Sequence, residues 1–505
     1  MKSNGITTDW IARWAHYSPA GIALTDDATG RNFTYQDLDI LASRTAGYLQ
    51  QQFGINPGDR VAVLSTNEPD YIPLFYALQR AGAIMVPLSF RLSSRELAFQ
   101  LADSSPSLLI SQMQFSEIVS GIPEDSKPPA HLNFDGENSL SSLMHNENLA
   151  ASFTPTAPDM DTPCMILYTS GTTGRPKGAL ITHGMLFWNS VNTGLRLNLV
   201  QQDVTLTFAP FFHTGGWNVL TTPFHHRGAR VILLRKFDPA RILHLCESEG
   251  VSILFGVPTM MDMLSREPEF AGKDLQNIRY AIVGGEPMPL ELIRTWHKKG
   301  VPIRQGYGLT EFGPNVFSLN EEDAERKIGS IGFPNFYIET RVANDDGTEC
   351  GVDEPGELLL KGPACMSGYW NNDMATAETI RNGWLHTGDI VRRDAEGYFY
   401  VVGRKKDMFI SGAENVYPAE IEHFLRTHPL IREVAVIGVP DSKWGEVGRA
   451  FIVAEPGEKL TSEDIRDFCE GNLARYKIPK HFTFLNELPK SDSGKILKRA
   501  LREKL

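Results

Sequence analysis

The sequence predicts an α/β protein with layered α/β subdomains in its N-terminal part, then a small β-barrel-like subdomain, and a smaller α+β part at the C-terminus. Helix-like and strand-like segments alternate through most of the first 330 residues, as in layered, mainly parallel sheets. From Lys327 onward, short strand candidates separated by Gly, Asp and Asn turns indicate a small barrel or antiparallel sheet. The 505 residues are also too many for one hydrophobic core.

The N-terminal part begins with a helix that Thr34 caps. Apolar residues recur at helical spacing from Leu38 to Leu49. A buried strand at 60–64, a helix near 71–81 and a strand at 83–86 follow. Residues 116–158 are richer in Ser, Pro, Asn and Glu, which predicts a looser excursion.

The C-terminal part contains shorter elements. We expect strands at 339–342, 356–361, 398–402, 434–439, 450–454 and 482–485, and helices at 418–427 and 462–473.

Composition limits the class of protein. The net charge of -12 argues against a nucleic-acid-binding surface. The most apolar long stretch, 72–88, is too short to span a bilayer. Five scattered cysteines without a C-x-x-C pair predict a reducing, cytoplasmic location and neither a metal site nor a disulfide framework. The oligomeric state stays open, a homodimer included.

The segment from Tyr168 to Gly178 has the composition of a phosphate-binding loop. It joins glycines, which let backbone N–H groups approach an anion, to hydroxyls, an arginine and a lysine. It is not a Walker loop, because Pro176 precedes Lys177 and Gly178 follows it. A flexible surface loop is the simpler alternative, but a solvated linker would not need this mixture after a buried strand.

Three more segments follow predicted strands and suggest ligand contacts. His213 lies between Phe211-Phe212 and Gly215-Gly216, where it either shapes an apolar pocket or is a satisfied core histidine. The paired glycines in 282–287 fit either a ligand at the carboxyl end of a strand or an ordinary turn. The segment 305–311 offers an aromatic ring, a hydroxyl and a carboxylate, which suit a base, a phosphate and a hard cation.

Segments nearer the C-terminus carry weak signals separately. A carboxylate in 384–389 and an arginine in 402–407 could bind vicinal ribose hydroxyls. Alone, the lysine in Pro489-Lys490-Ser491-Asp492-Ser493-Gly494-Lys495 would be a solvated charge.

In this order, the segments resemble the motifs of the adenylate-forming enzymes: acyl-CoA synthetases, the adenylation domains of peptide synthetases, and beetle luciferases. The resemblance extends nearly to the C-terminus. It implies an N-terminal AMP-binding domain at 1–402, a hinge at 403–408, and a C-terminal domain at 409–505 that rotates between two reaction steps.

The resemblance also implies a role for each matching residue. The triphosphate would contact Thr169, Ser170, Gly171, Thr172, Thr173, Gly174 and Lys177. Adenine would lie against Gly285, Glu286, Pro287 and Tyr307, and ribose against Asp389 and Arg404. Thr310 would donate to the α-phosphate, Glu311 would hold Mg²⁺, and His213 and Lys495 would act on the reacting carboxylate. Lys406 would be the pivot, Gly412 would let the pantetheine arm of CoA pass, and Trp444 would stack on the CoA adenine.

The function implied is an ATP-dependent acyl-CoA synthetase, which makes acyl-AMP and pyrophosphate and then transfers the acyl group to CoA. We expect a medium- or long-chain fatty acid as substrate, with an aryl acid as the alternative. Residues 208–227 contain no carboxylate to hold an ammonium, which disfavours α-amino acids. A stand-alone enzyme that loads a carrier protein in trans, a non-catalytic acyl-AMP or ATP sensor and a luciferase remain rivals.

Overall fold

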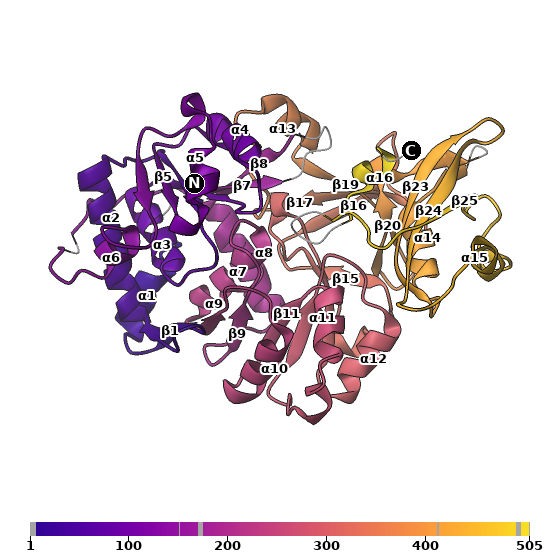
Figure 1. Ribbon diagram of the computed structural model, residues 1–505, viewed down its shortest axis with the longest axis horizontal. Coiled ribbons are helices and arrows are strands. Elements are labelled where there is room, and N and C mark those ends of the chain that lie inside the picture. The colour runs from indigo at the N-terminus through magenta and orange to yellow at the C-terminus, as the bar shows by residue number, and fades with distance from the viewer. Residues whose placement is uncertain (1–6, 151, 170–174, 412–413, 491–495, 504–505) are drawn as a thin grey trace. The chain divides into compact units, whose positions relative to one another are not determined.

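The computed structural model describes residues 7–150, 152–169, 175–411, 414–490 and 496–503 (Figure 1). The chain divides into two compact units: unit 1 comprises residues 1–339 and 360–385, and unit 2 comprises residues 340–359 and 386–505. The predicted α/β class, with a larger N-terminal and a smaller C-terminal part, is confirmed. The predicted hinge at 403–408 is not tested by this division and stays a prediction.

The first sheet of unit 1 has six strands in the order β6-β5-β3-β4-β7-β8. Their bounds are β3 Arg60–Leu64, β4 Ile84–Leu88, β5 Leu108–Ser111, β6 His131–Asn133, β7 Pro163–Thr169 and β8 Lys177–Thr182. The pairs are parallel except β7 with β8, which form an antiparallel hairpin. Residues 116–158 were predicted to form a looser excursion. This prediction is wrong at β6, which pairs with β5 in the sheet and buries Leu132.

The second sheet of unit 1 has the order β15-β14-β13-β12-β11-β9-β10-β1-β2. Its strands are β1 Ile22–Asp26, β2 Asn32–Thr34, β9 Val204–Thr207, β10 Arg230–Leu233, β11 Ile253–Gly256, β12 Tyr280–Val283, β13 Ile303–Tyr307, β14 Phe317–Ser318 and β15 Ser330–Pro334. The central strands are parallel, whereas β2, β14 and β15 pair antiparallel at the two sides.

Helices form three layers around these two sheets (Figure 1). One apolar cluster joins both sheets to the shared layer of α1 Trp10–Tyr17, α2 Tyr35–Phe53, α3 Tyr71–Ala81, α7 His183–Arg196 and α9 Thr221–Arg227. The other face of the first sheet packs on α4 Ser94–Ser104 and α5 Ser116–Ser120. The other face of the second sheet packs on α10 Pro239–Ser248, α11 Pro258–Ser265 and α12 Leu290–Lys298.

Short helices complete the described chain. They are α6 Leu140–Met144, α8 Thr214–Trp217, α13 Asp373–Thr379 and the 3₁₀ turns η1 Met113–Phe115, η2 Glu124–Ser126, η3 Phe270–Gly272, η4 Thr310–Phe312, η5 Glu321–Asp323 and η6 Lys405–Asp407. The strand β18 Ile380–Arg381 pairs with the start of β19 Trp384–Arg393. Among the described residues, no helix combines the length and apolar character needed to span a membrane.

The helix predicted after Thr34 is confirmed as α2. The Thr34 hydroxyl accepts from the Asp37 N–H at 3.1 Å, and the Asp37 carboxylate accepts from the Thr34 N–H at 2.8 Å. This reciprocal capping box satisfies donors that a helix start leaves unpaired. Gly54 ends the helix at φ +62°, a conformation that glycine adopts without strain.

Unit 2 contains two groups of strands. The first has the order β16-β17-β19-β20, with β16 Glu339–Ala343, β17 Gly356–Lys361 and β20 Phe399–Arg404. The second is a five-stranded sheet of β21 Phe409–Ser411, β22 Glu414–Val416, β23 Ile431–Asp441, β24 Gly445–Ala454 and β25 His481–Phe484. The helices α14 Pro418–Leu425 and α15 Ser462–Cys469 cover one face of it, and α16 Lys498–Arg502 covers the other.

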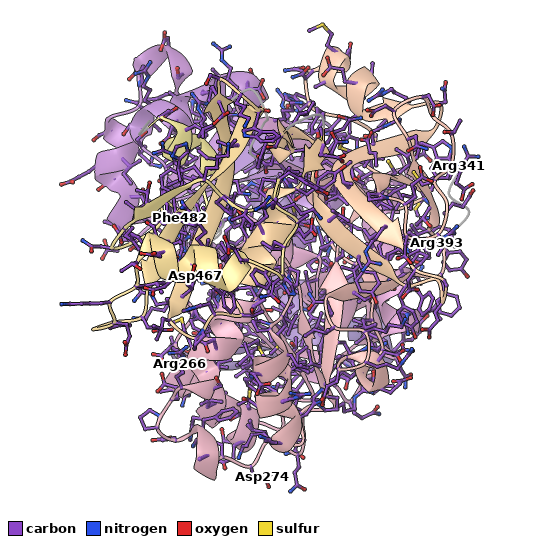
Figure 2. All side chains as sticks on the ribbon, turned by 90° about the vertical axis from the view of Figure 1, so that its right-hand side faces the viewer. Arg266, Asp274, Arg341, Arg393, Asp467 and Phe482 are labelled. Carbon is purple, nitrogen blue, oxygen red and sulfur yellow. The ribbon has the colours of Figure 1, made fainter. Side chains whose placement is uncertain are left out.

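The helix predicted at 462–473 is wrong at its C-terminal end. The helix α15 stops at Cys469, because Glu470 is extended and Gly471 has a φ of +76°. Figure 2 shows this region, with Asp467 labelled on α15 and Phe482 on β25. The Arg466 guanidinium lies 5.9 Å from the Phe482 ring centroid, so helix and edge strand pack through a cation–π contact.

Three histidines lie among α1, α3, α7 and α9: His183 and His225 are buried, and His226 is half-buried. The His226 ring stacks on Trp10 with centroids 4.4 Å apart, and its Nδ1 lies 2.8 Å from the Ser190 hydroxyl. Nδ1 of His225 lies 3.2 Å from the Tyr76 hydroxyl. Burial lowers the pKa of His226 and of His183 to about 4 and the pKa of His225 to about 3.

These histidines predict that unit 1 loses stability in mild acid. The unfolded chain binds protons near the ordinary histidine pKa of about 6.5, whereas the folded chain does not until about pH 4. Stability is therefore complete above about pH 6.5 and falls as the pH is lowered, by roughly 2 kcal/mol per such histidine at pH 5. Melting temperatures measured from pH 7.5 to pH 4.5 should fall less steeply in His226→Phe than in wild type.

The exposed His16 supplies the control for this prediction. His16→Gln should keep the wild-type slope of melting temperature against pH. An unchanged slope in His226→Phe would show that His226 does not couple protonation to unfolding.

Candidate functional site

The predicted phosphate loop connects two paired strands. Thr169 ends β7 and Lys177 begins β8, and the two residues stand opposite each other in the hairpin. The predicted contacts Ser170, Gly171, Thr172, Thr173 and Gly174 lie outside the described residues. The strand β8 was not predicted, because the Lys177-Gly178 pair is typical of a loop. In the structure, Ala179 and Ile181 of this strand are buried.

Glu311 lies in the 3₁₀ turn after β13 and receives two hydroxyl donors on one oxygen. Its Oε1 accepts from the Tyr369 hydroxyl at 3.0 Å and from the Thr169 hydroxyl at 3.3 Å. No described residue donates a hydrogen bond to its Oε2. Burial and the neighbouring Glu311 carboxylate raise the pKa of Tyr369, so this phenol remains a proton donor.

This arrangement fits Mg²⁺, which the resemblance implies. Magnesium binds through one or two carboxylates and otherwise keeps waters and substrate phosphates. Glu311 offers one carboxylate oxygen without a described donor, and the described residues contain no cluster of three or more His, Cys, Asp or Glu that would form a protein-only cage. Thr310, the predicted α-phosphate donor, precedes Glu311 in the same turn.

The Lys177 side chain lies over an aromatic face. Its Nζ is 5.0 Å from the centroid of the Tyr369 ring. Among the described residues, no carboxylate forms an ion pair with this ammonium. The structure therefore brings Thr169, Lys177 and Glu311 around one tyrosine that no sequence motif had indicated.

The predicted adenine contacts lie at the carboxyl ends of neighbouring parallel strands. Tyr307 ends β13 and packs edge-on against Phe317, with ring centroids 5.8 Å apart. Gly285, at φ +88°, begins the turn after β12, where an L side chain would be strained. The Gln305 amide fixes this turn, because it donates to the Glu286 carbonyl at 2.9 Å and accepts from the Met288 N–H at 3.0 Å. Pro287, which lies between Glu286 and Met288 in the chain, is half-buried.

His213 is the residue before the short helix α8, and its ring centroid is 4.6 Å from that of Phe212. The helix borders a small void through Gly215. The void has a volume of about 10 Å³, about the space of one water molecule, and is lined by Leu206, Thr207, Phe208, Ala209, Gly215, Leu220, Thr221 and Phe255. The two polar side chains that line the void are Thr207 and Thr221. Their hydroxyls lie 2.8 Å apart, and the Thr221 hydroxyl donates to the Gly216 carbonyl at 2.7 Å, so both hydroxyls have hydrogen-bond partners.

Trp217 supports this region from within the core. It is fully buried, its ring stacks on Phe211 at 4.2 Å, and its Nε1 donates to the Phe211 carbonyl at 2.7 Å. The Trp217 ring therefore fixes the segment from Phe211 to Trp217. The residue of this segment that lines the void is Gly215.

In unit 2, the predicted ribose pair is formed across β19 and β20. Asp389 and Arg404 are direct partners in this antiparallel register, and Arg404 Nε lies 3.1 Å from Asp389 Oδ1. Burial and the nearby Arg404 charge lower the pKa of Lys406, the predicted pivot, in the η6 turn. Gly412 and Lys495 lie outside the described residues.

Trp444, the predicted stacking residue for CoA, lies between β23 and β24. Its side chain is 40% exposed, and the Nζ atoms of Lys443 and Lys480 each lie 5.1 Å from its ring centroid. The Asp441 carboxylate accepts from the Lys443 and Trp444 N–H groups at 2.9 Å each and fixes the turn. An exposed aromatic face between two cations suits a phosphorylated purine.

Comparisons with known proteins match nearly the whole chain. The family described as AMP-binding enzyme matches residues 11–370, and the AMP-binding enzyme C-terminal domain matches residues 420–495. The chain is 39% identical to a feruloyl-CoA synthase of Amycolatopsis sp, covering 100% of both proteins. It is 38% identical to a long-chain-fatty-acid–CoA ligase of Mycobacterium tuberculosis, covering 100% of this chain and 98% of that protein.

A solved structure gives the same fold. The O-succinylbenzoate Coenzyme A synthetase of Bacillus subtilis, in complex with ATP and magnesium ion, has a TM-score of 0.86 at 32% identity. The match covers 98% of this chain and 99% of that chain.

Proposed function

Since the chain belongs to the AMP-binding enzyme family and is an AMP-forming acyl-CoA synthetase, we propose that it activates an aryl acid at the site around Thr169, Lys177 and Glu311. The observation that carries the site assignment is the grouping of three side chains around Tyr369: the Thr169 hydroxyl, the Lys177 ammonium and the Glu311 carboxylate. Among the described residues, the ammonium has no carboxylate partner and one oxygen of Glu311 has no donor. These are the groups needed to hold a triphosphate and its cation.

In the first step, the substrate carboxylate oxygen attacks the α-phosphorus of ATP. The bond from the α-phosphorus to the bridging oxygen breaks, and pyrophosphate leaves with that electron pair. Lys177 and the loop hydroxyls bind the negative oxygens, Thr310 donates to the α-phosphate, and Lys495 binds charge that gathers between carboxylate and phosphate. Glu311 would hold Mg²⁺, which when bound neutralises triphosphate charge.

In the second step, the CoA thiolate attacks the acyl carbonyl and AMP leaves. We assign the ribose to Asp389 and Arg404, whose carboxylate and guanidinium suit its hydroxyls. Adenine of ATP lies against Gly285, Glu286, Pro287 and Tyr307. The CoA nucleotide lies on Trp444 between Lys443 and Lys480, and Gly412 gives passage to its pantetheine arm.

The names of similar proteins support the choice of acid. Relatives named for aromatic acids include a feruloyl-CoA synthase at 39% identity and an indoleacetate–CoA ligase at 38%, whereas one relative at 38% is named for long-chain fatty acids. The fatty acid expected from the sequence therefore becomes the rival substrate.

A panel of carboxylic acids tests this choice. Pyrophosphate release that depends on CoA should give a higher kcat/KM with cinnamate-type and arylacetic acids than with octanoate or palmitate. A preference for palmitate would overturn the aryl assignment without touching the adenylation site. Gly215→Val should lower kcat/KM for the preferred acid and leave KM for ATP unchanged, because the added methyl groups extend toward Phe255, 3.9 Å from the new Cβ.

Three further assays distinguish the proposed function from the remaining alternatives. CoA as the sole acceptor distinguishes this enzyme from one that loads a carrier protein. ATP–pyrophosphate exchange distinguishes it from a non-catalytic sensor, and absence of light emission with oxygen distinguishes it from a luciferase.

A further inference from the structure

Tyr369 touches both charged groups of the proposed phosphate site, although it belongs to none of the motifs that predict this site. Its hydroxyl donates to Glu311 Oε1 at 3.0 Å, and its ring lies 5.0 Å from the Lys177 ammonium. One side chain thus contacts a cation through its face and an anion through its hydroxyl.

The backbone around Tyr369 is fixed to the strand that carries Lys177. Leu180 donates to the Gly368 carbonyl at 3.0 Å, and Trp370 donates to the Gly178 carbonyl at 2.7 Å. The Tyr369 N–H donates to the Thr376 hydroxyl at 2.8 Å, and its side chain is only 8% exposed. The ring therefore has little freedom to move independently of β8.

Opposite charges on flexible side chains attract each other when no ligand separates them. Lys177 and Glu311 approach the same tyrosine, yet they form no ion pair in the described structure. The Lys177 ammonium lies over the Tyr369 ring, and the Tyr369 hydroxyl donates a hydrogen bond to one carboxylate oxygen of Glu311. Tyr369 therefore contacts the two charged groups through two different parts of its side chain.

We propose that Tyr369 is a positioning residue that holds Glu311 for the metal and Lys177 for the triphosphate as separate charges. This inference rests on the proposed adenylation site. The ring and the hydroxyl make separable contributions, because phenylalanine keeps the contact with Lys177 and removes only the bond to Glu311.

The first experiment measures how nucleotide binding depends on Mg²⁺. With saturating ATP, the Mg²⁺ concentration that gives half of the ATP-induced rise in melting temperature should increase roughly 10-fold in Tyr369→Phe, as is typical when a residue orienting a metal ligand is lost. The concentration for half-maximal pyrophosphate release should rise equally, with KM for the acid unchanged. In Tyr369→Leu, the ATP-induced shift itself should also shrink, because Lys177 loses its aromatic support.

Tyr35→Phe is the matched control, since Tyr35 is fully buried and its hydroxyl donates to the Ala229 carbonyl at 2.8 Å. It should lower the melting temperature without ligand and leave the Mg²⁺ dependence at its wild-type value. A second comparison uses Glu311→Gln: adding Tyr369→Phe to that variant should cause no further change in Mg²⁺ dependence if Tyr369 acts through Glu311.

Two failures can be told apart. A wild-type protein without any Mg²⁺-dependent ATP shift and without pyrophosphate release would overturn the proposed function itself. A normal wild-type response with the same Mg²⁺ dependence in Tyr369→Phe, or an equal loss in the Glu311→Gln background, would overturn only the role of Tyr369.

Discussion

Replacing Lys495 with alanine should slow acyl-AMP formation roughly a hundred- to a thousandfold, the usual loss when one preorganised charge donor is removed. A lysine ammonium is a compact charge on a long stem and suits the negative charge that gathers between carboxylate and α-phosphate. If the C-terminal domain withdraws Lys495 before the second step, chemically supplied acyl-AMP should still become acyl-CoA at nearly the wild-type rate. Single-turnover measurements of each half-reaction check this difference.

Lys490 supplies the control for that experiment. It lies in the same C-terminal segment, and its Nζ forms an ion pair with Glu433 at 2.9 Å. Lys490→Ala should leave both half-reactions close to wild type. An equal loss of both half-reactions in Lys495→Ala would mean that Lys495 remains in the site throughout, which contradicts alternation of the domain.

Replacing Lys406 with proline should abolish most thioester formation and preserve acyl-AMP formation. Proline fixes φ near −65° and disfavours the helical region for the residue before it, here Lys405 in the η6 turn. A backbone that must rotate at this turn between the two steps would be locked in one of them. Rapid-quench assays of acyl-AMP and acyl-CoA, run on the same preparation, measure the two steps.

Lys406→Ala separates the backbone effect from loss of the amine. It removes the same side chain but leaves φ free, so it should retain much of the thioester activity. If alanine and proline reduce thioester formation equally, the amine matters and the backbone does not pivot at this residue.

The elements best predicted from sequence were those with local signals. Thr34 with Asp37 marks the start of α2, and the apolar spacing from Leu38 to Leu49 fixes its buried face. The end of α15 was misjudged because apolar spacing continued past Cys469, whereas Gly471 at positive φ decided where the helix stopped. Backbone conformation at one glycine outweighed the pattern.

The candidate site was predictable only where its residues belong to contiguous motifs. Thr169, Lys177 and Glu311 lie in such motifs, and the structure brings them together in unit 1. Tyr369 was missed because its place in the candidate site depends on pairing with β8, almost two hundred residues earlier in the chain. The size of the void at Gly215 was not predictable, since its walls come from two strands and two helix starts.

The helical layer shared by the two sheets of unit 1 has a mechanical consequence. The first sheet carries Lys177 on β8 and the second carries Tyr307 on β13, the residues proposed to contact the triphosphate and the adenine, so sliding of one sheet over the other would change the distance between them. A single close-packed apolar cluster links both sheets through α1, α2, α3, α7 and α9, and such interiors resist shear. The packing of unit 1 thus sets the spacing between these two proposed contacts before any ligand binds, and such preorganisation lowers the cost of binding.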